Sequence, residues 1–251
     1  RDLARALDSG DARRRPGLSR SPVSILLLHG AGGGGWEWNV WRRALRVAGY
    51  DVHAPDLMPD AGGLEATRIE HYLAQVASHA AQLTEPRILI GASLGGLLAL
   101  ATATQAGAAA LALVNPMPPA PESAQLAPRT ASPAVIPWRR DATLTGTRRA
   151  LPDADDLTCL YAMRRWRDES GAVMDAAYAG LEVAVPGCPV LVIASDADTE
   201  IPPSVSRALA ARLAADDEAV PVSYVGPLLG RDAIRSAKLV SDWLRARLSP
   251  C

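Results

Sequence analysis

A short run of small residues, Gly91-Ala92-Ser93-Leu94-Gly95, directly follows the apolar stretch Arg87–Ile90 and begins a second apolar stretch. The run fits the pattern G-x-S-x-G, in which a serine lies on a sharp turn between a β-strand and an α-helix. Such a turn strains the backbone at the serine, and the residues two before and two after it must lack a Cβ atom so that strand and helix can approach. The pattern therefore predicts a buried strand, a turn that exposes Ser93 at the end of a sheet, and a helix behind it. The alternative is a small-residue helix start that carries no chemistry.

A second glycine-rich turn, His29–Trp36, directly follows the apolar stretch Val23–Leu28. Acyl transfer to a serine requires two hydrogen-bond donors directed at the oxyanion that forms on the substrate. The backbone N–H of Leu94 and one N–H from Ala31 or Gly32 are candidates for these donors. A phosphate-binding loop is the less favoured alternative, because the run lacks G-K-[ST] and the acidic partner of a G-x-G-x-x-G motif.

Apolar, strand-like runs alternate with helical periodicity along most of the chain. A run that is apolar throughout and bounded by glycine is typical of a strand buried on both faces, as in a parallel sheet. We expect strands at Val23–Leu28, Asp51–Ala54, Arg87–Ile90, Ala109–Val114, Val190–Ala194 and Val220–Val225. We expect helices at Trp36–Val47, Leu64–Leu83, Leu94–Gln105, 153–180, Pro203–Ala214 and Asp232–Leu248. This order predicts an α/β protein with a mostly parallel sheet and helices on both of its faces.

The alternation is interrupted by a segment of different character. Proline recurs seven times between residues 116 and 137, among Ser, Thr and Arg, which excludes a core sheet there. We interpret 116–184 as a cap inserted into a single domain that spans 1–251. Residues 1–20 are charged, lack the apolar core of a signal peptide and are expected to form a loose arm or a short edge element.

Composition excludes several other classes of protein. The 26 basic and 27 acidic residues give a formal net charge of −1, which provides no electrostatic reason for binding nucleic acid or an anionic membrane. Three separated cysteines, Cys159, Cys188 and Cys251, form neither a disulfide framework nor a zinc motif, so we expect a reducing compartment, the cytoplasm. The apolar stretch Gly95–Val114 contains polar residues, which favours a buried helix and strand over a membrane span. We expect a small-molecule substrate or ligand, and no metal or organic cofactor is implied.

Three segments in this order, LLLHGAGGGG, GASLGG and SDADTEIPP, resemble the α/β-hydrolase superfamily, in particular its small serine esterases and lipase-like members. The resemblance covers about residues 23–248. It implies the α/β-hydrolase fold with a helical cap over the pocket. It also implies that Ser93 is the nucleophile and that Ala31, Gly32 and Leu94 surround the oxyanion hole.

The resemblance also implies where the other two members of a catalytic triad belong. In this family the acid lies after the strand that follows the cap, and the histidine comes last. Asp198 matches the acid position, with Asp196 as the second choice. Without Ser93 upstream, the same acidic turn would be interpreted as a solvated cap of the helix from Pro203. The histidine position, in the loop after the last strand, is occupied by Tyr224.

All four histidines, at positions 29, 53, 71 and 79, precede Ser93 in the chain. A neutral imidazole accepts the serine proton near pH 7, whereas a phenol with a pKa near 10 is only about a thousandth ionised there. Loss of the base costs about six orders of magnitude in a well-studied serine protease and leaves roughly 10³–10⁴-fold catalysis. The base is therefore the part of the triad that this chain lacks.

Three interpretations follow. The first is a working serine hydrolase in which His29 or His53 is the base, although each is more typical of a structural histidine. The second is a non-hydrolytic lyase, cyclase or ligand-binding protein in which Tyr224 donates a hydrogen bond. The third is a degenerate copy of an active esterase, a pseudoenzyme. We predict a hydrolase of carboxylic esters or thioesters whose incomplete triad of Ser93, Asp198 and Tyr224 lowers its activity.

The cap contains two clusters that combine basic and aromatic residues, Trp138-Arg139-Arg140 and Arg164-Arg165-Trp166-Arg167. Arginine forks bind carboxylate or phosphate groups of a substrate. The favoured alternative is a solvated helix face that pairs with Asp153, Asp155 and Asp156. The candidate substrate-binding residues are Trp36, Trp138, Arg164 and Arg165. Trp36, with Trp38 and Trp41, lies at a helix start, where packing is the more common role of such a cluster.

Overall fold

The computed structural model describes residues 23–248 of the chain. The expected arm at 1–20 and the cysteine at 251 therefore fall outside the described residues. The centre is a six-stranded sheet, all parallel, in the order β2-β1-β3-β4-β7-β8. Its strands are β1 (Ser24–Leu28), β2 (Asp51–His53), β3 (Arg87–Ala92), β4 (Ala108–Val114), β7 (Val190–Ala197) and β8 (Asp216–Ser223). This arrangement confirms the predicted fold class.

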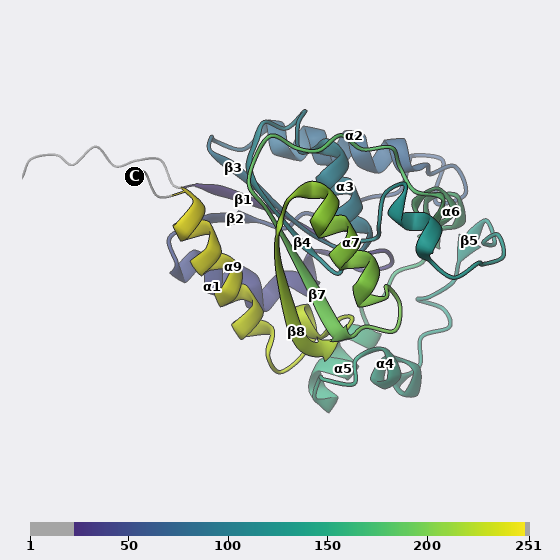
Figure 1. Cartoon of the computed structure of the whole chain (residues 1–251). Helices are drawn as coiled ribbons and strands as arrows, with labels where there is room; N and C mark the ends of the chain where they lie inside the picture. Colours follow the sequence, from purple (N-terminus) through teal and green to yellow (C-terminus); the bar gives the residue numbers. More distant parts are fainter. Residues whose placement is uncertain (1–22, 249–251) are drawn as a thin grey trace, which may run out of the picture.

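Helices cover both faces of the sheet (Figure 1). One face packs on α1 (Asn39–Val47), α8 (Gly226–Leu229) and α9 (Ala233–Leu248), and the other on α2 (Ile69–Ala81), α3 (Leu94–Thr102) and α7 (Pro203–Leu213). Successive side chains of a strand point to opposite faces, so Ile25 and Leu27 enter the first layer while Leu26 and Leu28 enter the second. All four are fully buried. Strands that are apolar on both faces are thus explained by two cores on one sheet.

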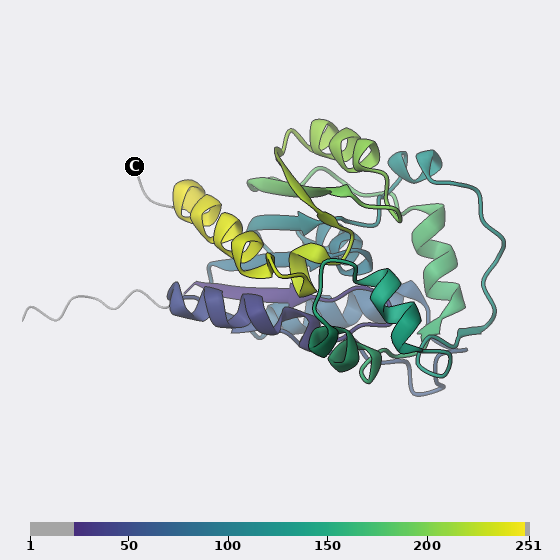
Figure 2. The same ribbon diagram turned by 90° about the horizontal axis from the view of Figure 1, so that it is seen from below.

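The chain between β4 and β7 lies beyond one end of the sheet (Figures 1 and 2). It contains η2 (Glu122–Gln125), β5 (Val135–Ile136), α4 (Leu144–Ala150), α5 (Asp156–Met163), β6 (Glu169–Ser170) and α6 (Gly171–Ala179). β5 and β6 form a small antiparallel pair. We continue to treat 116–184 as a cap within one domain, as a proposal.

Several predicted boundaries were wrong, and local contacts explain each difference. The helix expected from Leu64 begins at Ile69, because the hydroxyl of Thr67 donates to Gly63 O and accepts from Asp60 N, which holds the preceding residues in turns. The single helical region expected over 153–180 is two helices, α5 and α6, because the residues between them leave the helix and end in the β5–β6 pair. Helix α4 was not predicted at all.

The last strand also differs from the prediction of Val220–Val225. β8 begins at Asp216 and ends at Ser223, and it pairs with β7 along this length. Its first residues are polar because β8 is the edge of the sheet and they remain partly exposed. Tyr224 therefore lies just beyond the strand, at the beginning of the loop that leads to α8.

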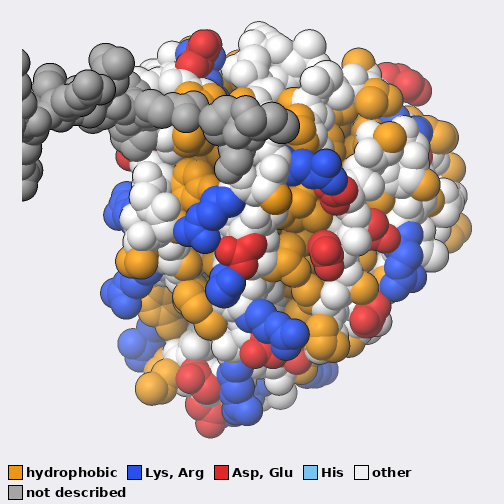
Figure 3. Space-filling model, turned by 60° about the vertical axis from the view of Figure 1, so that its left-hand side comes forward, with side chains coloured by type: hydrophobic (Ala, Val, Ile, Leu, Met, Phe, Trp, Pro, Cys, Tyr) orange, Lys and Arg blue, Asp and Glu red, His pale blue; other side chains and the backbone are white. Residues whose placement is uncertain are grey.

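The side of the molecule toward which α1 and α9 lie carries interspersed basic and acidic side chains (Figure 3). On α9, Asp242 pairs with Lys238 and, at 3.1 Å, with Arg245. Arg247 of the same helix pairs with Asp216 at the start of β8. Charges of both signs on this side are thus arranged as neighbouring ion pairs.

Candidate active site

Ser93 lies on the turn between β3 and α3, with φ 52° and ψ −123°. Residues other than glycine rarely adopt a positive φ, so the backbone at Ser93 is strained and must be held by its surroundings. A Cβ atom at Gly91 would overlap with the carbonyl oxygen of Gly95, and one at Gly95 would overlap with the carbonyl oxygen of Leu28. The two glycines thus allow β3, α3 and β1 to meet at the turn, as the steric interpretation of the motif requires.

The glycine-rich turn 30–35 follows β1 and passes beside Ser93. A Cβ atom at Gly30 would lie 3.3 Å from Ser93 Cβ, so the loop backbone is in close contact with the serine. Gly32 has φ +65°, a conformation that favours glycine. Its N–H donates to Glu169 Oε2 at 3.0 Å. Ala31, by contrast, lines the same cavity as Ser93.

Carboxylates hold this glycine turn from three separate parts of the chain. They accept its backbone N–H groups as follows: Glu37 from Gly30 at 3.2 Å, Asp56 from Gly35 at 2.7 Å, and Glu169 from Gly32 at 3.0 Å. Glu37 belongs to the short 3₁₀-helix η1 (Gly35–Trp38), and its carboxyl is buried. Burial raises the pKa of Glu37 to about 8. Glu169 belongs to the inserted segment and is also buried.

Arg167 holds the same turn through its carbonyl groups. Its backbone N–H donates to Gly32 O at 2.7 Å and its Nε donates to Gly33 O at 2.5 Å. Sequence reasoning did not find Glu37, Arg167 or Glu169 in these roles. The one sequence signal for Glu37 was an acidic residue between Trp36 and Trp38, at the start of an expected helix.

Asp198 lies after β7 and is buried, with 8% of its surface exposed. Its Oδ1 accepts hydrogen bonds from Glu200 N at 2.8 Å and Ile201 N at 2.9 Å. Its Oδ2 is buried and has no hydrogen-bond partner within the described residues. Burial raises the pKa of Asp198 to about 6. Asp196, the second choice, is exposed and pairs with Arg207 at 3.1 Å.

The side chain of Tyr224 interacts with both Ser93 and Asp198. Its hydroxyl is hydrogen-bonded to the Ser93 side chain, and the nearby charge of Asp198 opposes its ionisation. Burial raises the pKa of Tyr224 well above its ordinary value, so the phenol keeps its proton. Its backbone carbonyl accepts from Asn115 Nδ2 at 2.7 Å. Asn115, the residue after β4, was not identified from the sequence.

The histidines are engaged elsewhere. His29 is buried, with Nδ1 2.7 Å from Gly30 O and Nε2 accepting from Leu57 N at 2.9 Å. Burial lowers the pKa of His29 to about 4, which keeps the ring neutral. His53 is exposed and pairs with Asp51 at 2.8 Å. Among the described residues, no histidine lines the cavity at Ser93.

A cavity of about 430 Å³ opens at Ser93. Trp138 and Arg149 line it from the inserted segment, and Met117, Met174 and Ile201 contribute apolar surface. Of the four predicted substrate-binding residues, only Trp138 is part of this wall. The arginine at the cavity is Arg149, which sequence reasoning did not single out.

The other three predicted residues do not line this cavity. Trp36 packs edge-on against Tyr161 and Trp166, with ring centroids 5.8 and 5.2 Å away. Arg165 lies over the ring of Tyr161, 3.6 Å from its centroid, and Arg164 is exposed. Arg164 and Arg165 are exposed, as the favoured alternative of a solvated face expected, but the three aspartates of that alternative have other partners. Asp153 accepts from Ser223 N, Asp155 caps α5 at Thr158 N, and Asp156 pairs with Arg148.

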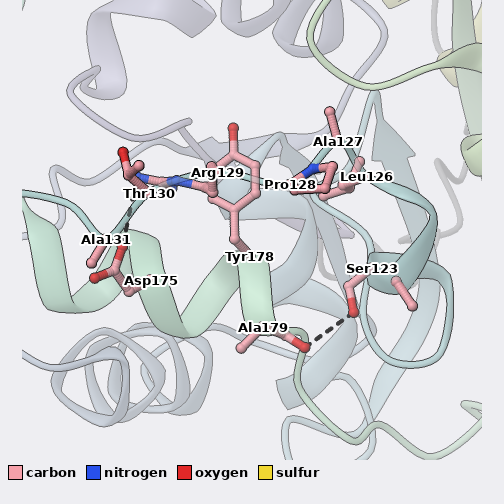
Figure 4. A pocket seen from close by; sticks show the side chains of 11 residues that line it. Ser123, Leu126, Ala127, Pro128, Arg129, Thr130, Ala131, Asp175, Tyr178 and Ala179 are labelled. Atoms are coloured by element: carbon pink, nitrogen blue, oxygen red, sulfur yellow. Dashed lines mark hydrogen bonds and ion pairs between the residues drawn. The ribbon is translucent and has the colours of Figure 1, made fainter.

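A second cavity, of about 410 Å³, adjoins the first at Tyr178 of α6. Met174 of this helix faces the Ser93 cavity, Asp175 faces the second cavity, and Tyr178 lines both. Figure 4 shows Arg129 extended beside the ring of Tyr178. Its guanidinium lies 4.1 Å from the ring centroid, and it is 3.6 Å from the carboxylate of Asp175. Tyr178 is thus the residue that the two linings share.

The described residues contain neither a metal-binding cluster nor a membrane-spanning helix. Over residues 23–248, no three or more His, Cys, Asp or Glu side chains are grouped so that they could bind a metal ion. None of the helices in that range has both the length and the apolar character of a membrane span.

Comparison with known proteins finds a matching family model and several proteins of the same fold. The model of a family described as alpha/beta hydrolase matches residues 25–229. A pyrethroid hydrolase of Sphingobium wenxiniae is 41% identical over 78 residues, which is 30% of this chain and only 28% of that protein. The crystal structure of a pyrethroid hydrolase from Sphingobium faniae has a TM-score of 0.69 at 23% identity, covering 90% of this chain and 98% of the other. Tomato methylketone synthase I complexed with 2-tridecanone has a TM-score of 0.69 at 14% identity, with 89% and 98% covered.

Proposed function

Because the chain belongs to the alpha/beta hydrolase family, we propose that it is a slow serine hydrolase of carboxylic esters or thioesters whose triad lacks its imidazole. One observation carries the proposal. Ser93 lies on a strained turn at a cavity, and Tyr224 interacts both with Ser93 and with a buried acid, Asp198, whose second oxygen has no partner within the described residues. A histidine in the place of Tyr224 would provide both the partner for this oxygen and the base for the serine.

Each residue has a distinct role in this proposal. The Ser93 hydroxyl attacks the carbonyl carbon, and the N–H groups of Leu94 and Ala31 bind the oxyanion. Ala31 is favoured over Gly32 because the Gly32 N–H already donates to Glu169. Tyr224 keeps its proton because burial raises its pKa, so it interacts with the serine without accepting its proton.

The substrate class follows from the cavity walls. Apolar side chains from the sheet side and the cap surround Ser93, with the Trp138 ring among them. Pockets of this kind bind ligands mainly through apolar contact, with a few polar groups that fix orientation. The relatives are named for pyrethroid hydrolysis and, in one structure, hold 2-tridecanone. We therefore propose esters with extended apolar groups as the substrates.

The test compares the natural chain with Tyr224→His and Ser93→Ala. A fluorophosphonate probe reports on the nucleophile, and hydrolysis of an activated ester reports on turnover. We expect slow labelling at Ser93 in the natural chain, none in Ser93→Ala, and an increase of kcat/KM by at least about 10²-fold in Tyr224→His, because a base is worth 10²–10⁴-fold. Absence of labelling and turnover in both the natural chain and Tyr224→His would contradict the proposal.

A second candidate function is binding of a small molecule without hydrolysis. The neutral phenol of Tyr224 and the lack of a histidine at the cavity favour it. In that case an apolar ketone or ester binds reversibly and is recovered unchanged. Failure of Tyr224→His to gain turnover, together with ligand binding by both proteins, would support this candidate.

A further inference from the structure

The carboxyl group of Glu37 lies on the inner side of the glycine turn, next to Ser93. Only 5% of the residue is exposed. Its Oε2 accepts from Gly30 N, and a Cβ atom at Gly30 would lie 3.8 Å from Ser93 Oγ. One residue of backbone therefore separates this carboxyl from the serine hydroxyl.

A small cavity, of about 80 Å³, is lined by both Glu37 and Ser93. Its lining contains four side chains with polar atoms, namely Glu37, Ser93, Trp166 and Tyr224. The other lining residues are apolar or glycine. One water molecule needs about 10–15 Å³ of such space and two to four polar partners. The cavity therefore has room for water within reach of the serine and the carboxyl.

The charged and titratable groups around Glu37 come from several elements. Burial raises the pKa of Glu37 and outweighs the hydrogen bond from Gly30 N–H and the charge of Arg167 in the inserted segment, which lower it. The charge of Asp56, in the loop after β2, raises it further. His29, at the end of β1, stays neutral because burial lowers its pKa. Tyr224 stays protonated because burial raises its pKa. In the range around pH 8, Glu37 is thus the group at this cavity that gains or loses a proton.

We propose that Glu37 is the general base of this site and takes the Ser93 proton through a water molecule in the small cavity that both residues line. This inference rests on the proposed hydrolase function and names the group that replaces the imidazole. The Ser93 hydroxyl gives its proton to the water, and the water gives a proton to the Glu37 carboxylate. The oxygen lone pair of Ser93 forms a bond to the ester carbonyl carbon while the π electrons move to the carbonyl oxygen.

The remaining steps return the proton. The tetrahedral adduct re-forms its carbonyl bond and expels the alkoxide, which takes the proton from the Glu37 carboxyl through the same water and leaves as an alcohol. A second water then attacks the acyl carbon and gives a proton to Glu37. The acyl–Ser93 bond breaks, the acid is released, and the proton returns to the serine oxygen. No oxidant, reductant or further reactant is needed.

The test measures the pH dependence of fluorophosphonate labelling and of activated-ester hydrolysis between pH 6 and 9.5. In the natural chain we expect the rate constant to rise with pH and to level off above about pH 8, where Glu37 is ionised. In Glu37→Gln we expect a loss of at least tenfold at pH 9 and no inflection near pH 8. Glu122→Gln is the matched control, because Glu122 is equally buried but binds Arg212 away from the cavity; its profile should match that of the natural chain.

Thermal unfolding and the Tyr224→His background separate the explanations. The amide of Glu37→Gln can still accept the Gly30 N–H, so its Tm at pH 9 should equal or exceed that of the natural chain. In Tyr224→His, where the imidazole accepts the proton, the loss caused by Glu37→Gln should shrink below about threefold. Labelling of Glu37→Gln at the natural rate would overturn the role of Glu37. An inactive natural chain with an active Tyr224→His variant would overturn the role of Glu37 while leaving Ser93 as a nucleophile that lacks only its imidazole. Inactivity of both proteins would reject the two proposals together.

Discussion

Folding removes two carboxyl groups near Ser93 from water, and each responds by holding its proton more tightly. For Asp198, two backbone N–H groups stabilise the charged form, but burial outweighs them. An ion without a partner is costly in a protein interior, so such groups raise their pKa and become neutral more readily. Sequence motifs identified Asp198 by its position, but its unpartnered oxygen follows from neighbours that the motif does not contain.

Replacement of Asp198 by Asn should therefore change the pH dependence of stability. The folded pKa of about 6 exceeds the unfolded value of 3.8, so the folded state binds more protons between these values. The free energy of unfolding of the natural chain consequently falls as the pH rises from about 4 to above 6, by up to about 3 kcal/mol. Asp198→Asn lacks this loss, and we expect it to be about 1–3 kcal/mol more stable than the natural chain at pH 8 and equal to it at pH 4.

Urea unfolding at several pH values measures this difference. Asp196→Asn is the matched control, because Asp196 is exposed and binds Arg207 at the surface. That control should show no gain that grows with pH. Parallel stability curves for the natural chain and Asp198→Asn would show that the carboxyl is not the cause.

At the level of elements, the turn at Ser93 depends on close contact between three backbone segments. Gly91 and Gly95 lie where β3, α3 and β1 leave no room for a Cβ atom. This requirement is local, so the motif identified the turn without any knowledge of the fold. The start of α2 and the break between α5 and α6 were not predictable in this way, because they depend on Thr67 and on the β5–β6 pair.

Gly95→Ala should destabilise the protein although alanine favours helices. Alanine gains about 1 kcal/mol of helix propensity over glycine, but here its Cβ atom overlaps with the carbonyl oxygen of Leu28. Overpacking of this kind costs about 1–3 kcal/mol or more. We expect a lower free energy of unfolding by about 2 kcal/mol, measured by urea unfolding. Gly187→Ala is the control, since a Cβ atom there meets nothing within 4 Å, and it should stay within about 0.5 kcal/mol of the natural chain.

At the scale of the whole molecule, the cavity at Ser93 is formed where the inserted segment meets the end of the sheet. The cavity at Ser93 takes its walls from β3, the loops after β7 and β8, and residues 138–178 of the insertion. Tyr178 lines both this cavity and the second one. The guanidinium of Arg129 packs on its ring and pairs with the carboxylate of Asp175. We predict that Tyr178 limits the length of an apolar chain that fits beside Ser93.

Tyr178→Ala should join the two cavities and shift selectivity toward longer acyl chains. Each additional buried CH₂ group contributes about 0.8 kcal/mol, so the ratio of kcat/KM for a long-chain ester to that for a short-chain ester should rise by about tenfold or more. The measurement is made in the Tyr224→His background to obtain sufficient turnover. Tyr178→Phe keeps the ring and should keep the natural ratio. An unchanged ratio in Tyr178→Ala would show that the second cavity does not receive substrate.

Local sequence was sufficient for the six strands of the parallel sheet, the long helices outside the insertion, the turn at Ser93 and the absence of histidine after it. Each of these follows from residues that are neighbours in the chain or from a repeating pattern of apolar side chains. The contact of Glu169 with Gly32 joins positions 137 residues apart. The small cavity at Glu37, Ser93 and Tyr224 is lined by η1, β3, β4 and α8 together with loop residues. Only the folded chain decides such features, because burial, and with it the pKa of a carboxyl group, depends on which distant segments exclude water from it.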